Sequence, residues 1–401
     1  MRIAFLLGSG VSIPAGMPST MDITEKILSG EGVKRHTNGN YYFDQSLYAH
    51  KGIKDKYVKR VVTFLEMLKV EIDLYYLNHP WHPTNYEDLY YVASQIKDSL
   101  SEEYDNPAVN LIIDKILPNI CPLLIGNDRE IGEEWELRQE LLYLAHEATN
   151  YIHDIVWRLL TKEPRRTDHL KSLKDACLDC QLSCIDIFTL NHDTVLEQYL
   201  SQNGIQVTDG FGEPLNEVRY WNPNLFETGS SKVRLFKLHG SVNWFRFRPD
   251  RGDWSNESIG IPLNRDIWYT KTPRGEMQWP VDGRPMFLVG TFNKILEYTS
   301  KIFIELFCQF YRSLLHSKQL VVCGYGFGDK GINTRIVEWV YSSPDRRILL
   351  IHPQPEELKE SARGAISNKW DKWMRHKKLT ILQKKIEETS WQDIKDILFK
   401  I

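Results

Sequence analysis

The first thirty residues contain, in order, an apolar run, a glycine-containing turn and a segment with helical periodicity. Residues 3–7 are continuously apolar and stop at the turn Gly8-Ser9-Gly10. Residues 21–28 then place apolar side chains at helical spacing. A buried strand, a glycine-rich turn and a helix in this order are typical of a nucleotide-binding unit. The pattern therefore predicts that the chain opens as a Rossmann-like fold.

Between residues 55 and 175 the pattern changes to long amphipathic segments with proline-containing breaks, and after residue 183 short apolar strands return. The expected helices cover residues 57–77, 86–100 and 133–160, and the expected strands cover 184–190, 234–238, 319–323 and 347–352. We therefore predict an α/β fold, a Rossmann-like parallel sheet flanked by helices with a large helical insertion. Residues 1–30 and 180–401 would form the sheet domain, and residues 31–179 the helical insertion domain.

Two local patterns add detail to this outline. Residues 243–287 are rich in Trp, Pro, Gly and Arg with little periodicity, so we expect a long structured loop, a kind of segment that often acts as a lid. Thr194 and Glu197 have the spacing of a capping box, which predicts a helix start after the strand at 184–190.

Composition narrows the class of protein. The 401 residues are 42% hydrophobic and 26% charged, and no segment reaches the roughly 20 apolar residues that span a bilayer, so we expect a soluble protein without membrane contact. A formal net charge of −3 gives no overall basic field for nucleic acid. Six cysteines, two of them in strongly apolar segments (Cys308 and Cys323), favour reduced thiols and a cytoplasmic location.

Unusual residues follow four of the expected strands. Because ligand groups gather at the carboxyl ends of strands in an open α/β sheet, one pocket could collect all four segments. Glycines at positions 8 and 10 would let backbone amides approach a pyrophosphate. The four segments are Gly8-Ser9-Gly10, Asn191-His192-Asp193, His239-Gly240 and Gly324-Tyr325-Gly326.

These segments resemble, in order, the motifs of the sirtuin family. Residues 8–18 resemble the family's opening loop, Leu190-Asn191-His192-Asp193 its Gln-Asn-x-Asp element, and His239-Gly240 its His-Gly. Residues 324–326 correspond loosely to its Gly-Thr-Ser element. The chain departs from deacetylating sirtuins in two respects. It lacks their Asp-Phe-Arg after the opening loop, and no four zinc-binding cysteines follow His239, so no zinc and no other metal is expected.

The chain is also similar to zinc-free sirtuin-like domains of prokaryotic antiviral defence systems. The shared elements are Thr-Leu-Asn-x-Asp at 189–193, Leu-His-Gly-Ser-x-Asn-Trp at 238–244 and Gly-Tyr-x-Phe-x-Asp at 324–329. That resemblance implies an antiphage NAD glycohydrolase, which cleaves NAD to nicotinamide and ADP-ribose and uses no cofactor beyond NAD as substrate. It also implies a homo-oligomer and a partner such as a HerA-like hexameric ATPase or another defence protein.

The residue types suit this chemistry. Asn191 could orient water or ribose hydroxyls and His239 could accept a proton near neutral pH, so we expect these two to be catalytic. Each also has an ordinary structural interpretation, Asn191 and Asp193 as turn and cap residues and His239 as a packed histidine. The expected NAD-binding residues are Gly8, Ser9, Gly10, Ser12, Asp193, Gly324, Tyr325 and Gly326.

Other functions stay open at this stage. The chain could be a regulatory subunit that binds NAD or ADP-ribose without turnover. It could also be a nucleic-acid-directed nuclease effector, since the aromatic and basic residues 244–248 could stack on single strands, although their period-two alternation equally fits a half-buried strand. A protein deacylase is the least favoured because the zinc module is missing.

Overall fold

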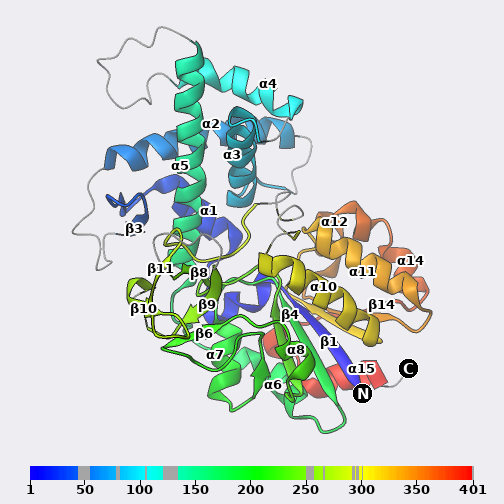
Figure 1. The fold of residues 1–401 in the computed structure, drawn as a ribbon. Coiled ribbons are helices and arrows are strands. Elements are labelled where there is room, and N and C mark those ends of the chain that lie inside the picture. Colours follow the sequence, from blue (N-terminus) through cyan, green and yellow to red (C-terminus); the bar gives the residue numbers. More distant parts are fainter. Residues whose placement is uncertain are drawn as a thin grey trace. The chain divides into compact units, whose positions relative to one another are not determined.

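The chain forms two compact units. The computed structural model describes residues 1–43, 55–77, 82–103, 106–120, 134–249, 257–264, 267–290, 294, 298–299 and 301–399. The first unit, here the sheet unit, comprises Met1–Met17, Thr161–Leu288 and Lys294–Ile401. The second, here the helical unit, comprises Pro18–Leu160 and Val289–Asn293 (Figure 1).

A seven-stranded parallel sheet lies at the centre of the sheet unit, in the order β14-β13-β12-β1-β4-β7-β5. β1 lies between β12 and β4, so the strand order reverses at the β1–β12 boundary, where open α/β sheets bind ligands. The predicted Rossmann-like parallel sheet is therefore confirmed. The strands are β1 (Arg2–Leu7), β4 (Cys184–Thr189), β5 (Val207–Thr208), β7 (Val233–Lys237), β12 (Gln319–Cys323), β13 (Arg347–Ile351) and β14 (Leu379–Leu382).

The continuous apolar run at the amino terminus is explained by burial on both faces of the sheet. Ala4 and Leu6 join one core cluster, while Ile3, Phe5 and Leu7 join the other. Side chains alternate across a strand, so a strand buried on both faces needs apolar residues at every position.

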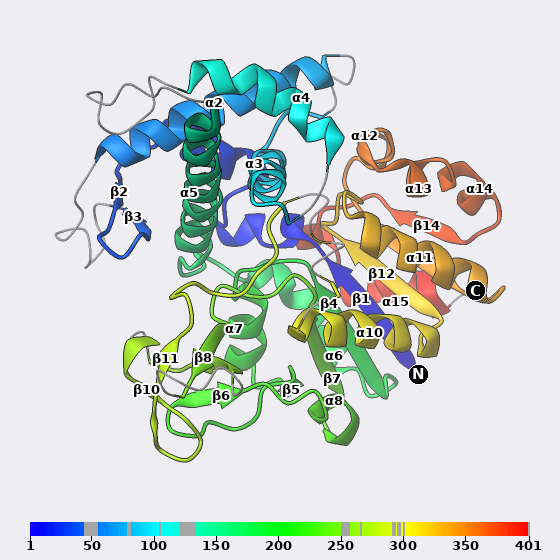
Figure 2. The same cartoon turned by 45° about the horizontal axis from the view of Figure 1, so that its top comes forward.

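Helices cover both faces of this sheet. α10 (Lys301–His316) packs Phe303, Phe310 and Leu314 into the cluster that contains Leu6, and α11 (Lys330–Ser342) joins the same cluster. Figure 2 shows α10 and α15 with the sheet strands between them. The opposite cluster is filled by α6 (Lys171–Leu178), α7 (Val195–Gln202) and α15 (Trp391–Phe399). The remaining helices of this unit are α8 (Leu225–Thr228), α12 (Pro355–Ser361), α13 (Gly364–Ser367) and α14 (Trp370–Arg375).

The prediction of one long loop over residues 243–287 is wrong, because four strands of a second, antiparallel sheet of order β10-β11-β8-β9-β6 lie within this segment. Its clearest strand alternates buried Phe245 and Phe247 with half-buried Arg246 and Arg248. Because Phe245 and Phe247 are buried, their rings cannot stack on the bases of nucleic acid. The strands are β6 (Val218–Tyr220), β8 (Phe245–Arg248), β9 (Ser258–Pro262), β10 (Thr270–Lys271) and β11 (Met277–Pro280).

The helical unit contains the long helices that the sequence predicts. α3 and α5 pack against each other, and the Tyr151 hydroxyl on α5 donates to the Ile27 carbonyl of α1 at 2.8 Å. The predicted insertion, residues 31–179, overlaps this unit, which also includes α1 and Val289–Asn293 and whose first segment ends at Leu160. The elements are α1 (Thr20–Ser29), β2 (Val33–Arg35), β3 (Tyr41–Phe43), α2 (Asp55–Tyr76), α3 (Tyr86–Leu100), α4 (Pro107–Ile116) and α5 (Glu134–Leu160).

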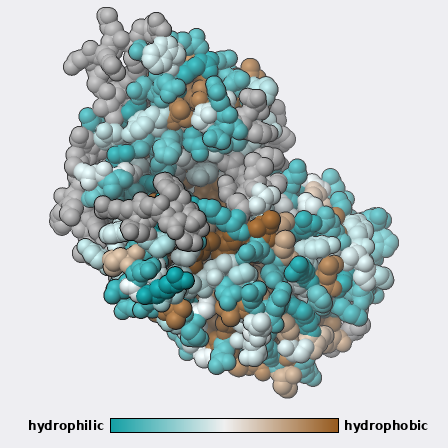
Figure 3. Space-filling model, in the orientation of Figure 1, coloured by the Kyte–Doolittle hydropathy of each residue, from teal (hydrophilic) through white to brown (hydrophobic). Residues whose placement is uncertain are grey.

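The surface carries mostly hydrophilic side chains on the face shown in Figure 3, with apolar ones interspersed. No helix among the described residues is long and apolar enough to cross a membrane.

Two glycine turns touch backbone to backbone where the strand order reverses. The Gly8 amide donates to the Cys323 carbonyl and the Gly10 amide to the Gly324 carbonyl, each at 3.0 Å. A β-carbon at Gly8 would lie 2.4 Å from the Gly324 oxygen, and one at Gly10 would lie 2.8 Å from the Gly324 Cα. Gly324 itself has a φ of +66°, and a β-carbon there would lie 2.6 Å from the Val11 amide nitrogen. Glycine is therefore required at these three positions, because the two loops approach each other too closely for a side chain.

The contact predicts that Gly10→Val destabilises the sheet unit by about 3 kcal/mol, because the added atoms have no space beside the Gly324 backbone. Gly326→Ala is the matched control, since a β-carbon there meets nothing within 4 Å. Urea unfolding of both variants measures the difference. Equal midpoints for the two variants would show that the loops separate easily.

Candidate functional site

The sheet order brings together the four strand ends that the sequence singles out. β12, β1, β4 and β7 are neighbours and parallel, so their carboxyl ends share one edge. The loops are tied to one another there: the Leu190 amide donates to the Leu7 carbonyl and the Leu238 amide to the Thr189 carbonyl. Side chains from the four loops therefore share one edge of the sheet.

Asn191 is held in a fixed orientation by the turn after β1. Its Nδ2 donates to the Gly8 carbonyl at 3.1 Å and to Ser12 Oγ at 2.8 Å. A carbonyl can only accept, so the nitrogen end of the carboxamide must face Gly8. The opposite end, Oδ1, is buried and has no hydrogen-bond partner. Asn191 therefore presents a desolvated acceptor whose direction is set by the surrounding backbone.

His239 belongs to a buried cluster with Tyr298 and Asp329. Its Nε2 lies 2.6 Å from Tyr298 Oη and 3.1 Å from Asp329 Oδ2, and Tyr298 Oη also donates to that oxygen at 2.9 Å. Burial raises the pKa of Asp329, but the hydrogen bond and charge of His239 outweigh it and hold the pKa below its ordinary value. Asp329 is thus a carboxylate, which can only accept, so His239 donates to it through Nε2.

The carboxylate of Asp329 is placed by the start of α11. Its Oδ1 accepts from the Ile332 amide at 3.0 Å as the helix N-cap. The hydroxyl of Tyr325 accepts from the Asp329 amide at 3.2 Å and lies 3.0 Å from Asn333 Oδ1. The side chain of Tyr325, which the sequence assigns to NAD binding, is therefore engaged in fixing this loop.

Sequence reasoning missed Tyr298 and the role of Asp329. An aspartate before Lys-Gly-Ile-Asn carries the signal of an N-cap, which would have placed Asp329 at a helix start. Tyr298 carries no such signal, because nothing in its local sequence distinguishes it from other tyrosines.

Asp193 caps α7, and the predicted capping box is wrong. The Val195 amide donates a hydrogen bond to Asp193 Oδ1 at 3.0 Å, whereas Thr194 makes no side-chain capping bond.

Glu197 instead forms an ion pair with the buried Lys237 at 2.8 Å, and Lys237 Nζ also donates to the Asp193 carbonyl. Burial raises the pKa of Glu197 above its ordinary value, although the charge of Lys237 lowers it. Lys237 therefore joins the end of β7 to the loop that carries Asn191.

A small cavity with a mixed polar and apolar lining lies between these groups. Its volume is about 10 Å³, the space of one water molecule, and its lining includes Ser12, Asn191, Asp193, Glu197 and Lys237. Glu197 Oε2, like Asn191 Oδ1, is buried without a partner. The cavity is polar enough to hold a water beside Asn191.

The glycine turn differs from the predicted phosphate loop. The amides of Gly8 and Gly10 donate to protein carbonyls, so these two amides cannot also donate to a phosphate. Two short 3₁₀ turns, Ser9–Val11 and Ile13–Ala15, follow β1 before α1 begins. A role for Ser9, Ser12, Gly324 and Gly326 in binding NAD stays a prediction.

Metal-binding groups are absent from the described residues: no three His, Cys, Asp or Glu side chains gather to hold an ion. Cys177 and Cys323 are buried, and burial raises the pKa of each thiol to about 12. Cys121 lies outside the described residues.

The buried pair leads to a stability prediction. Lys237→Met should cost about 3 kcal/mol of unfolding free energy, because it leaves the Glu197 carboxylate without its counter-charge. The double variant Lys237→Met/Glu197→Gln should recover part of this loss. Lys359→Met, which breaks a surface pair with Asp371, is the control and should leave the free energy of unfolding nearly unchanged. A double variant no more stable than Lys237→Met alone would argue against charge imbalance as the cause.

Comparison with known proteins gives one family match, over the part of the chain that follows the long helices of the helical unit. Residues 186–374 match the SIR2-like domain family. No curated protein matches the chain. Among solved structures, a serine-to-alanine mutant of a Sir2 homologue in complex with ADP ribose is similar over 94% of this chain and 91% of that chain, at 10% identity and a TM-score of 0.31. The matched range contains Asn191, His239 and Asp329, and the part of the chain that holds them is similar to a SIR2-like domain.

Proposed function

We propose that the protein is an NAD glycohydrolase that converts NAD and water to nicotinamide, ADP-ribose and a proton. The observation that carries the proposal is the buried, unpartnered Oδ1 of Asn191 at the carboxyl edge of the sheet. A desolvated acceptor of fixed direction can hold a ribose hydroxyl or the attacking water in place. The match of residues 186–374 to the SIR2-like domain supports NAD as the substrate.

The reaction depends more on positioning the attacking water than on a strong base. The bond between ribose C1′ and the nicotinamide nitrogen breaks, and its electron pair returns to the ring, so nicotinamide leaves neutral. A water oxygen forms the new bond to C1′ and loses one proton. His239 is suited to accept that proton, because the anionic Asp329 at 3.1 Å would stabilise the resulting imidazolium. Asn191 and His239 are the proposed catalytic residues.

The substrate would lie against the loops that surround them. We assign Gly8, Ser9, Gly10, Ser12, Asp193, Gly324, Tyr325 and Gly326 to the wall of this site. Ser12 has the most direct support, since its hydroxyl accepts from Asn191. Gly8, Gly10 and Tyr325 would act through the shape of the loops that they hold together.

A defence role rests on the shared motifs alone. The elements at 189–193, 238–244 and 324–329 support a proposal that NAD depletion protects cells from phage, in a homo-oligomer or beside a HerA-like ATPase. Plaque counts on cells that express the intact chain or its Asn191→Ala variant test this role.

Replacement of either catalytic residue should remove activity. We expect Asn191→Ala and His239→Ala to lower nicotinamide release from NAD by at least about a hundredfold. His376→Ala, at an exposed histidine, is the control and should retain the full rate. Nicotinamide is followed by chromatography, and circular dichroism checks that the variants fold. A rate near that of the intact protein in either variant would refute the assignment.

Chelation tests the expected independence from metal. Dialysis against EDTA should leave the rate of NAD cleavage unchanged, because the proposed steps use only water, Asn191 and His239. Elemental analysis of the dialysed protein accompanies the assay. Stoichiometric zinc together with loss of activity after chelation would contradict the prediction.

A further inference from the structure

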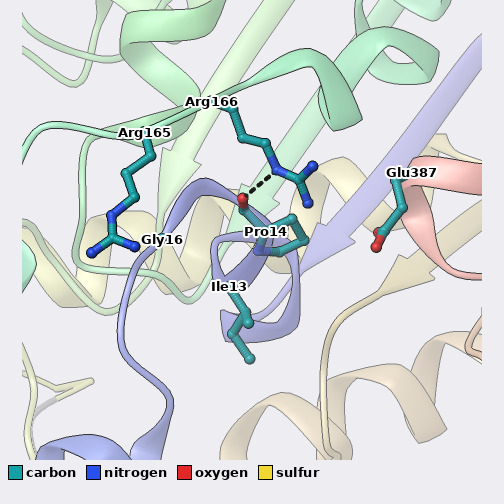
Figure 4. Close-up of a pocket in the computed structure, with 6 residues that line it drawn as sticks. All are labelled: Ile13, Pro14, Gly16, Arg165, Arg166 and Glu387. Carbon is teal, nitrogen blue, oxygen red and sulfur yellow. Dashed lines mark hydrogen bonds between the residues drawn. The ribbon is translucent and has the colours of Figure 1, made fainter.

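Residues 165–169 donate three hydrogen bonds to backbone carbonyls of the turn at residues 11–15. Both segments belong to the sheet unit, whose first part ends at Met17 and whose second part begins at Thr161. Figure 4 shows Arg166 beside this turn, with its bond dashed. The three bonds run from His169 Nε2 to Val11 at 2.8 Å, from Arg166 Nε to Pro14 at 2.9 Å and from the Arg165 amide to Ala15 at 2.8 Å.

The bond from His169 is the buried one. His169 is 3% exposed, whereas Arg166 is exposed and its bond competes with water. Because a carbonyl can only accept, Nε2 of His169 carries the proton and donates to Val11. Burial lowers the pKa of His169, and the hydrogen bond to Val11, which raises it, has the smaller effect. His169 is therefore a neutral donor at pH 7.

The Val11 carbonyl and the Ser12 amide belong to one peptide group. A peptide group is planar, so a donor that fixes the direction of the carbonyl also fixes the direction of the amide that follows. The Ser12 hydroxyl in turn accepts from Asn191 Nδ2 at 2.8 Å. Two hydrogen bonds and one peptide plane therefore connect His169 to the carboxamide of Asn191.

The same turn also forms part of the small cavity beside Asn191. The lining includes Val11 and Leu170, the residue that follows His169. A cavity of about 10 Å³ has room for one water molecule. A displacement of Val11 would therefore change the space that a water can occupy beside Asn191.

We propose that His169 is a positioning residue of this site, which acts through the turn on the direction of Asn191 Oδ1. The proposal rests on the proposed function, because this direction matters for catalysis only if Asn191 holds the water or the ribose. Asn191 Nδ2 also donates to the Gly8 carbonyl, so we expect the carboxamide to rotate, and not to leave the site, when Ser12 moves. Loss of the bond from His169 should therefore slow the chemical step more than it weakens substrate binding.

Two substitutions separate the hydrogen bond of His169 from its packing. His169→Leu removes the donor and keeps a side chain of similar size, whereas His169→Gln keeps a neutral Nε2 donor. In His169→Leu, we expect kcat for nicotinamide release, and with it kcat/KM, to fall by roughly tenfold or more, while KM changes by less than about twofold. In His169→Gln, kcat should return to within about threefold of that of the intact chain.

Tyr151→Phe is the matched control in the helical unit. It removes a bond of the same kind, from a buried side chain to the Ile27 carbonyl at 2.8 Å, and keeps the aromatic ring. This variant should retain the kcat of the intact chain. The positioning role is overturned if His169→Leu is as active as the intact chain, or if His169→Gln is no more active than His169→Leu.

Hydrogen exchange tests the bond to Val11 without an assay of activity. The amides of Ser12, Ala15 and Met17 donate within the turn. Mass spectrometry of peptides over residues 9–17 should therefore show exchange at least about fivefold faster in His169→Leu than in the intact chain, and unchanged exchange in His169→Gln and Tyr151→Phe. Absence of nicotinamide release from the intact chain would refute the glycohydrolase, whereas unchanged exchange in His169→Leu would refute the positioning of the turn by His169.

Discussion

The backbone contact between the turn at residues 8–10 and Gly324 is the constraint on which the site depends. Two neighbouring parallel strands leave the sheet at their carboxyl ends, and their loops approach more closely than any β-carbon permits. The contact sets the path of both loops. One loop continues to Ser12, which accepts from Asn191, and the other continues to Tyr325 and Asp329, which contacts His239. This one backbone contact therefore helps to position both proposed catalytic residues.

Buried charges then fix the neighbouring loops. Lys237 with Glu197 links β7 to α7, and Asp329 with His239 links the start of α11 to the loop after β7. Burial of charge is unfavourable unless each group is paired, so each pair holds two elements in a defined geometry. A site that stabilises charge development benefits from groups held in this way before the substrate binds.

The family match covers only part of the candidate site, and the hydrogen bonds between its loops define the rest. The match begins at residue 186, so it covers Asn191, His239 and Asp329 but not the glycine turn after β1. The inclusion of Ser12 in the site rests on its hydrogen bond to Asn191 and not on similarity.

The sequence alone determined five of the seven strands of the main sheet, the long helices of the helical unit and the set of strand ends that carry chemistry. Residues 3–7 and 320–323 are apolar at every position, because both faces of these strands are buried, and a pattern of this kind can be read without knowing the packing partners. It did not determine the second sheet, whose short strands are interrupted by Gly and Pro. It also did not reveal that the Gly10 amide donates to the Gly324 carbonyl or that Glu197 pairs with Lys237. Those features join residues distant in the chain, and such pairings are decided by how loops pack, which only the tertiary structure records.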